Sequence, residues 1–264
     1  MHEPMAELGE RRISHHVLPE AVPATPPAVR YGWRLRIGMI IPSVASNPEA
    51  HITAMLPDGV TLHATRLKMD ESDANAMLHF TDKVEEAAAL LQDAGVGHVL
   101  VNCTAVTTAD PTIGERIRAR IRAATGLPAS TTGDGVIAAL NRLNARKIVL
   151  LTPYRNDINE REARFLEHYG FEVVDWKGLE LHGARDFDRV EPAAWYQFVM
   201  SHRREDADVY FVSCAQVRII EMLGALERDL DRPVISSNQC AAWHVLRQRG
   251  INDRVPGFGT LMQL

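Results

Sequence analysis

Two cysteines, Cys103 and Cys214, have the residue type and the position that acid–base or nucleophilic chemistry requires. Each closes a short, mostly apolar run, HVLVNC and DVYFVSC, that is typical of a buried strand. Ligands bind beyond the carboxyl ends of strands in an open parallel sheet. A helix N-terminus there favours the thiolate, which is both a nucleophile and a base. Two such groups flanking one carbon can remove a proton from one face and deliver a proton to the other.

The spacing of the two cysteines supports this interpretation, because free cysteine is also a common apolar filler in protein cores. Cys103 follows Pro42 by 61 residues, and Cys214 follows Pro153 by the same 61 residues. Both prolines end an apolar run of their own. Two cysteines at matched positions favour function over filler. Cys240, which stands beside two alanines in a helical stretch, is better explained as filler.

Small polar residues follow the same runs and are candidates for holding a substrate carboxylate. They are Ser43, Thr104, Tyr154 and Asn156. Hydroxyl and amide groups at helix starts bind carboxylates well, although each of these residues alone is more commonly a helix cap. The chain has no G-x-G-x-x-G after a strand, no P-loop, no C-x-x-C and no H-E-x-x-H. Zinc therefore has no support in the sequence, and nucleotide cofactors are not first-rank candidates.

Alternating strand and helix patterns surround these residues and predict parallel sheets built from right-handed βαβ units. The predicted strands cover residues 35–41, 60–67, 98–103, 128–131, 147–152, 171–176, 208–214 and 233–237. The predicted helices cover residues 83–95, 113–125, 134–144, 156–169, 192–204, 217–230 and 240–250, with Asp134 as the cap of the third.

The order of elements restarts halfway along the chain. Residues 34–145 and 146–264 each begin with a strand that ends in proline, and each reaches a cysteine at the end of a later strand. The fold class that this predicts is α/β, with two pseudo-symmetric parallel-sheet halves and the active site in the cleft between them. Coincidence between two generic α/β halves is the alternative. Residues 1–33 contain four closely spaced prolines between residues 19 and 27, without hydrophobic periodicity, and are predicted to be a flexible N-terminal arm.

Composition excludes several classes of protein. The 264 residues are 46% hydrophobic and 24% charged, which is ordinary for a globular protein. A net charge of −5 argues against a nucleic-acid partner, and no run approaches the length of a membrane helix. Three cysteines are too few, and odd in number, for a disulfide framework. With a polar N-terminus that lacks a signal-peptide core, these features predict a cytoplasmic protein.

These segments resemble the aspartate/glutamate/hydantoin racemase superfamily. The resemblance is greatest to its branch of maleate cis-trans isomerases, arylmalonate decarboxylases and ectoine-utilisation racemase-like proteins. It extends from about residue 35 to residue 259. It is carried by RIGMIIPS, AMLPDGVTLHATRL, the Cys103–Thr104 pair, LTPYRNDINERE, FVSC and SNQCAAWHVLRQRGI. The last segment is most similar to the ectoine-utilisation group.

The resemblance implies Rossmann- or flavodoxin-like halves, a site between them, and neither metal nor organic cofactor. In maleate isomerases the first cysteine attacks the alkene and the second handles a proton, whereas amino-acid racemases exchange a proton between the two. Arylmalonate decarboxylases carry glycine in place of the first cysteine, so Cys103 speaks against plain decarboxylation. Thr104 and Tyr154 match positions that hold a substrate carboxylate. The family also implies a homo-oligomer.

One residue departs from the family pattern. The isomerases carry an asparagine in a PSxN sequence, where this chain has Ala45, and its nearest asparagine is Asn47. Loss of the amide removes a charge-assisted hydrogen bond worth about 1.5–3 kcal/mol, which weakens the case for maleate.

The sequence thus predicts a cofactor-independent isomerase acting on a small carboxylate or amino acid, with Cys103 and Cys214 as its acid/base or nucleophile pair. Cis-trans isomerisation and racemisation both remain open, with a role in ectoine degradation as one setting. The alternatives are an arylmalonate-type decarboxylase and a non-catalytic protein that binds small carboxylates.

Overall fold

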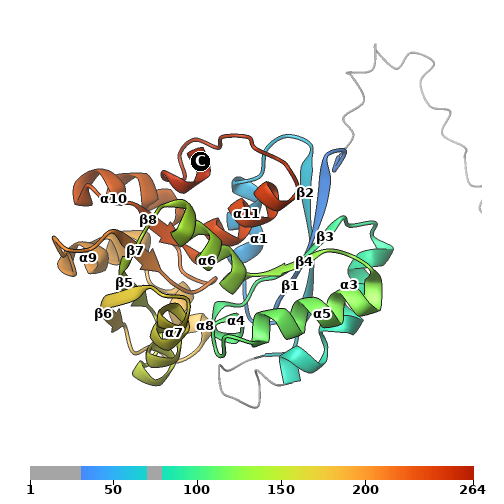
Figure 1. Ribbon diagram of the computed structural model, residues 1–264, viewed down its shortest axis with the longest axis horizontal. Coiled ribbons are helices and arrows are strands. Elements are labelled where there is room, and N and C mark those ends of the chain that lie inside the picture. Colours follow the sequence, from blue (N-terminus) through green and yellow to red (C-terminus); the bar gives the residue numbers. More distant parts are fainter. Residues whose placement is uncertain (1–30, 70–78) are drawn as a thin grey trace, which may run out of the picture. The chain divides into compact units, whose positions relative to one another are not determined.

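Two parallel four-stranded sheets form the framework of the chain (Figure 1). The computed structural model describes residues 31–69 and 79–264. The first sheet contains β1 (Leu35–Pro42), β2 (Val60–Leu67), β3 (His98–Val101) and β4 (Ala129–Thr131), in the order β2-β1-β3-β4. The second contains β5 (Lys147–Thr152), β6 (Glu172–Gly178), β7 (Val209–Val212) and β8 (Val234–Ser236), in the order β6-β5-β7-β8. The identical strand order confirms the predicted pair of pseudo-symmetric halves.

The central strands are apolar because both of their faces are buried. Along β1, Ile40 belongs to one hydrophobic core, whereas Ile37 and Met39 belong to a second core. Along β5, Val149 and Leu150 are divided between the two cores in the same way. This period of two is what a strand covered on both sides requires.

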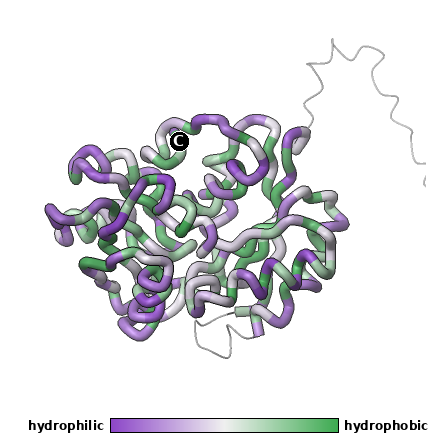
Figure 2. The backbone as a smooth tube through the Cα atoms, in the orientation of Figure 1, coloured by the Kyte–Doolittle hydropathy of each residue, from purple (hydrophilic) through white to green (hydrophobic). Residues whose placement is uncertain are grey.

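Amphipathic helices cover the outer faces of the sheets. They include α3 (Val84–Asp93), α5 (Ile113–Thr125), α9 (Pro192–Ser201) and α10 (Leu223–Leu230), whose buried side chains share one core with both sheets. In α5, Ile113, Ile117 and Ile121 form the buried stripe. The alternation of hydrophobic and hydrophilic residues along this helix is visible in Figure 2.

Two further helices, α6 (Thr132–Arg142) and α11 (Ser237–Gln248), pack against each other between the sheets (Figure 1). They follow equivalent strands, β4 and β8. A Cβ atom on Gly135 of α6 would lie 2.8 Å from the carbonyl oxygen of Cys240 on α11, so only glycine allows this approach. Cys240 is fully buried there, which agrees with its predicted role as filler.

Each of these central helices also contacts the opposite half. Helix α11 packs against β3 and α1 (Pro48–Ala54) of the first half. Gly133 of α6 lies close to Phe165 of α7 (Asn156–His168) in the second half. The predicted boundary between residues 145 and 146 falls between α6 and β5. The predicted arm, residues 1–33, lies outside the described residues up to residue 30, and Tyr31 and Trp33 are exposed.

Several helix starts differ from the prediction. Helix α6 is capped by Thr131, whose hydroxyl accepts from the Asp134 N–H at 3.2 Å while the Asp134 carboxylate accepts from the Thr131 N–H at 2.8 Å. Asp134 therefore sits at the third helical position and is not the cap. Ser236 and Gln239 form the same capping box, so α11 begins at Ser237, three residues earlier than predicted.

The helix predicted from residue 217 begins only at Leu223, after the 3-10 turn η1 (Ile220–Met222). The short helices α1, α4 (Thr104–Thr107) and α8 (Ala184–Asp188) are among those that escaped prediction, because their sequences lack a long apolar period. The 3-10 turn η2 (Leu261–Gln263) follows α11 near the end of the chain.

Candidate active site

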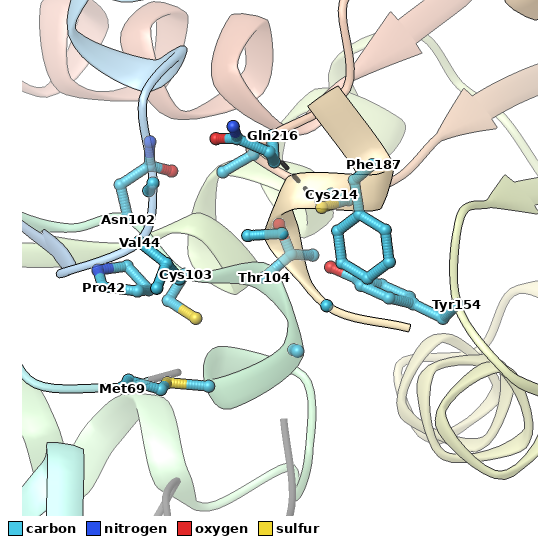
Figure 3. Close-up of a pocket in the computed structure, with 15 residues that line it drawn as sticks. Pro42, Val44, Met69, Asn102, Cys103, Thr104, Tyr154, Phe187, Cys214 and Gln216 are labelled. Atoms are coloured by element: carbon cyan, nitrogen blue, oxygen red, sulfur yellow. Dashed lines mark hydrogen bonds between the residues drawn. The ribbon is translucent and has the colours of Figure 1, made fainter. Parts of the chain in front are cut away.

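A small cavity of about 60 Å³ lies between the two halves (Figure 3). Segments that follow β1, β3, β5 and β7 all contribute to its wall. The lining residues are Pro42, Val44, Ala45, Met69, Asn102, Cys103, Thr104, Ala105, Tyr154, Gly183, Ala184, Phe187, Cys214, Ala215 and Gln216. The structure therefore brings the two cysteines to one cavity, from equivalent ends of β3 and β7.

Cys103 is the N-cap residue of α4 and has extended backbone geometry. Its sulfur accepts a hydrogen bond from the Val106 backbone N–H, which stabilises the thiolate. Burial acts in the opposite direction and is the larger influence, so the pKa of the Cys103 thiol is raised to about 12.

Cys214 is held in an uncommon backbone conformation, with φ at +100°. A non-glycine residue at positive φ is strained and persists only when its surroundings fix it. The Cys214 N–H donates to the Ser237 hydroxyl at 3.0 Å, and the Cys214 sulfur accepts from the Gln216 N–H at 3.4 Å. Burial raises the pKa of this thiol to about 11, opposed by the Tyr154 hydroxyl and by backbone N–H groups. Strain that is maintained in this way is characteristic of functional sites.

The expectation that helix N-termini would lower both cysteine pKa values is wrong for the protein alone, because burial outweighs the backbone donors. Both groups are thiols at neutral pH. The N–H groups that face each sulfur nevertheless provide hydrogen bonds for the charge that develops when one of them loses its proton.

Thr104 and Tyr154 also line the cavity, and their predicted contact with a substrate carboxylate stays a prediction. The Thr104 side chain is buried, and its hydroxyl has no hydrogen-bond partner among the residues that the structure describes. A buried hydroxyl without a partner is costly, so a ligand oxygen at this point would stabilise it. The Tyr154 ring packs edge-on against Phe187, with 5.6 Å between ring centroids, and burial raises its pKa. It remains a neutral hydroxyl that faces Cys214 (Figure 3).

Ser43 and Asn156 do not line the cavity. The Ser43 hydroxyl accepts a hydrogen bond from the Met69 N–H at 3.2 Å, which fixes the chain after β1. Asn156 is exposed in the first turn of α7, whereas Asn159, one turn later, is buried and accepts from the Thr152 hydroxyl at 2.5 Å. The phase of α7 thus turns Asn159 inward and leaves Asn156 in solvent, which corrects the prediction for both Ser43 and Asn156.

Asn47 does not replace the missing amide at Ala45. Its side chain donates to the Gln216 carbonyl at 2.8 Å and to the Asp188 carboxylate at 2.9 Å. Gln216 in turn accepts from the Ser46 N–H at 3.0 Å. These bonds join the loop after β1 to the Cys214 loop, and they leave the methyl group of Ala45 on the cavity wall.

A neutral hydrogen-bond network behind the cavity was not predicted. The Thr132 hydroxyl donates to Asn102 at 2.7 Å, and the Asn102 amide donates to Asn238 at 2.9 Å. The Asn238 amide then donates to the Ala215 carbonyl at 2.7 Å. The network thereby connects the residue before Cys103 with the residue after Cys214. Asn102 precedes Cys103 in the sequence, but no sequence pattern indicates that Asn238 is the hydrogen-bond partner of Asn102.

A buried carboxyl group behind Cys214 was also missed. Glu162 of α7 is 1% exposed, and its carboxylate accepts from the Ser213 hydroxyl at 2.6 Å. Burial raises its pKa to about 7. In a charged helical segment, a glutamate is expected to be exposed to solvent. Only the orientation of α7 in the folded protein shows that Glu162 lies on the buried face.

Two absences apply to the described residues. In the ranges 31–69 and 79–264, no three His, Cys, Asp or Glu side chains group so as to hold a metal ion. Within those same ranges, no helix has both the length and the apolar character needed to cross a membrane.

Comparison with known proteins agrees with this geometry. The arylmalonate decarboxylase family model matches residues 37–262. A maleate isomerase of Pseudomonas putida is 26% identical over 86% of this chain and 96% of its own. The arylmalonate decarboxylase of Bordetella bronchiseptica is 27% identical over 85% of this chain and 95% of its own. The crystal structure of a maleate isomerase from Pseudomonas putida S16 superposes with a TM-score of 0.81 at 24% identity, covering 87% of this chain and 98% of that one. The chain therefore belongs to the arylmalonate decarboxylase family.

Proposed function

We propose that this protein is a cofactor-independent isomerase that acts on a small carboxylate through Cys103 and Cys214. The observation that carries the proposal is that the two cysteines leave equivalent strands of the two halves and line one cavity. Maleate isomerases among its relatives support the assignment to isomerases.

The proposed reaction needs one thiolate and one thiol. In a racemisation, the thiolate takes the proton from the carbon next to the carboxylate, and the electron pair spreads into that carboxylate. The opposite thiol then delivers its proton to the other face, which inverts the carbon and leaves the charge on the second sulfur. Thr104 and Tyr154 donate to the carboxylate, where negative charge accumulates.

In a cis-trans isomerisation, the thiolate acts as a nucleophile instead of a base. The thiolate adds to one alkene carbon while the opposite thiol protonates the other. Rotation about the new single bond precedes loss of that proton and expulsion of the thiolate, so the pair returns to its starting state. The arrangement of Cys103 and Cys214 suits both reactions.

The cavity wall favours the first reaction. Among the described residues, its lining includes no lysine, arginine or histidine, and it does include the apolar side chains of Val44, Ala45, Met69 and Phe187. A substrate with a second carboxylate would place that charge against apolar side chains, which is unfavourable. We infer a substrate with one carboxylate and a small, uncharged substituent, racemised at the carbon between them.

Proton NMR in deuterium oxide tests the proposal with small dicarboxylates and chiral monocarboxylates, including amino acids and ectoine-derived diamino acids. Deuterium entering the α-carbon together with loss of optical activity identifies a racemase. Conversion of maleate to fumarate identifies the cis-trans isomerase and contradicts the inferred single carboxylate. Cys103→Ser and Cys214→Ser variants run in the same assay, and most activity remaining in either one would rule out the two-cysteine reaction.

Decarboxylation is the second candidate, because a relative over most of the chain is an arylmalonate decarboxylase and apolar side chains are among those that line the cavity. Arylmalonates added to the same panel test it, since release of carbon dioxide is recorded separately from deuterium exchange. If Cys214→Ser abolished that release and Cys103→Ser did not, the decarboxylase would be the better assignment. If the protein is instead a non-catalytic carboxylate-binding protein, a bound carboxylate should protect both thiols from alkylation, and no compound of the panel should be converted.

A further inference from the structure

Glu162 has an unusual environment for a carboxyl group. It is almost fully buried on α7, and one oxygen, Oε1, accepts from the Ser213 hydroxyl at 2.6 Å. The other oxygen, Oε2, is buried without a hydrogen-bond partner among the described residues. Ser213 directly precedes Cys214, so the carboxyl group stands behind that cysteine. An incompletely satisfied buried carboxyl is costly and calls for a functional reason.

The equivalent position in the first half is neutral. Asn102 precedes Cys103 as Ser213 precedes Cys214, and its side chain bonds to Thr132 and Asn238. A carboxylate, Glu162, is among the groups that raise the pKa of Cys214, whereas no carboxylate is among those that shift the pKa of Cys103. The two halves share their strand order but surround their cysteines with different charge.

We propose that Glu162 is a positioning residue that fixes the strained Cys214 loop through Ser213 and, by its charge, adds to the opposition of the site to loss of the Cys214 proton. The relevance of this residue to turnover rests on the two-cysteine reaction proposed above. Among the described residues, the carboxyl group stands behind Cys214, whereas neutral amides occupy the equivalent place behind Cys103.

The direction of the effect follows from electrostatics in a buried site. A carboxylate close to a thiol disfavours the thiolate and raises the thiol pKa, which is the influence of Glu162 on Cys214. Burial raises the pKa of Glu162 itself to about 7, with the Ser213 hydrogen bond opposing it. Glu162 is therefore charged above pH 7 and acts on Cys214 there, and it is neutral and without this influence below that pH.

The groups that face Glu162 do not cancel its charge. They are Cys214 after β7 and Tyr154 after β5, both of which are neutral at pH 7. Helix α7 also packs against β6, but the charged side chains of that strand do not shift the pKa of Glu162. Those side chains are Glu172, Asp175 and Lys177.

The test is site-resolved alkylation of the full chain with iodoacetamide, without substrate, in the wild type and in Glu162→Gln. The amide still accepts from Ser213 but carries no charge. At pH 8.5 we expect Cys214 to react about tenfold faster in the variant, because one pKa unit changes the thiolate fraction tenfold. At pH 6 the two proteins should match within about twofold, and Cys103 should change by less than about twofold at both pH values.

Two further variants make the outcome decisive. Glu160→Gln removes an exposed carboxylate from the same helix and should leave both rates unchanged. Ser213→Ala keeps the Glu162 carboxyl but removes the hydrogen bond that lowers its pKa. The pH above which Glu162 is charged and slows Cys214 alkylation should therefore rise. Circular dichroism melting identifies any variant that fails to fold.

The proposal is overturned if Glu162→Gln leaves Cys214 alkylation unchanged at pH 8.5, or if it accelerates Cys103 equally. It is also overturned if the ratio of variant to wild type is the same at pH 6 and pH 8.5. Alkylation needs no turnover, so these results stand apart from the two-cysteine reaction. That reaction is judged instead by deuterium exchange in the cysteine variants.

Discussion

The Cys103 loop and the Cys214 loop occupy equivalent places in two sheets of the same strand order, yet their surroundings differ. Cys103 begins a short helix in ordinary extended geometry and is backed by neutral amides. Cys214 has a strained backbone, a hydroxyl that accepts from its N–H, and a buried carboxyl group behind Ser213. The repeated scaffold places two thiols symmetrically, and the residues around them make the pair asymmetric. Asymmetry of this kind is what a reaction with one acid and one base needs.

The largest effect should come from removing either thiol. We expect Cys103→Ser and Cys214→Ser each to lower the rate of deuterium exchange at least about 10³-fold, because the hydroxyl of serine is a far weaker acid and nucleophile than the thiol. Cys240→Ala is the matched control, since Cys240 lies in the core and lines no part of the cavity. It should keep its turnover and lose only stability. Equal activity in all three variants would remove the basis for comparing the two loops.

The next effect concerns the contact of the two central helices. Gly135→Ala should lower the free energy of unfolding by about 1–3 kcal/mol, because its Cβ would collide with the Cys240 carbonyl. Gly224→Ala in α10 is the control, since its Cβ would have a nearest neighbour at 3.7 Å, and alanine favours helix. Urea unfolding measures both. A Gly135→Ala protein as stable as the wild type would show that the helices can separate at no cost.

A smaller effect is expected at the carboxylate. Thr104→Val should raise KM roughly ten- to hundredfold, since a hydrogen bond to a charged group contributes about 1.5–3 kcal/mol. The control is Thr53→Val, an exposed threonine on α1. Steady-state kinetics on the substrate found by NMR provide the measurement. If KM stayed the same and kcat fell, Thr104 would act only in the transition state.

The smallest effect is a loss of stability at alkaline pH. Both thiols have folded-state pKa values above the unfolded value, about 12 for Cys103 and about 11 for Cys214. Each therefore contributes stability that is complete below about pH 8.5 and is lost as pH rises towards the folded-state pKa. At pH 9.5, ionisation of each thiol in the unfolded chain lowers the free energy of unfolding by about 1.4 kcal/mol. Thermal melts from pH 8 to 11 should show a shallower decline in the Cys103→Ser/Cys214→Ser double variant, and identical slopes would contradict the burial argument.

Features that a single segment of the sequence determines were predictable, whereas features that depend on contacts between distant segments were not. The strands were found within about two residues because each is a local apolar run. The cysteine pair could be proposed because its two members have the same spacing from the proline of their own half, and its catalytic role stays a prediction. Asn156 was misplaced and Glu162 was missed because tertiary packing sets the phase of α7, and this packing buries Asn159 and Glu162 within an otherwise charged helix. The bond from Asn102 to Asn238 joins segments 136 residues apart, and no local pattern encodes it.

Helices α6 and α11 each pack against the opposite half of the molecule, and this arrangement has a consequence for the origin of the chain. A half-length protein with this architecture would expose the apolar face against which the other half's helix packs, and it would hold one cysteine of the two. Such an ancestor would need a second copy of itself both to be stable and to complete the cavity. Fusion of the two copies into one polypeptide then freed each loop to change alone, since a mutation in a symmetric dimer alters both sites together.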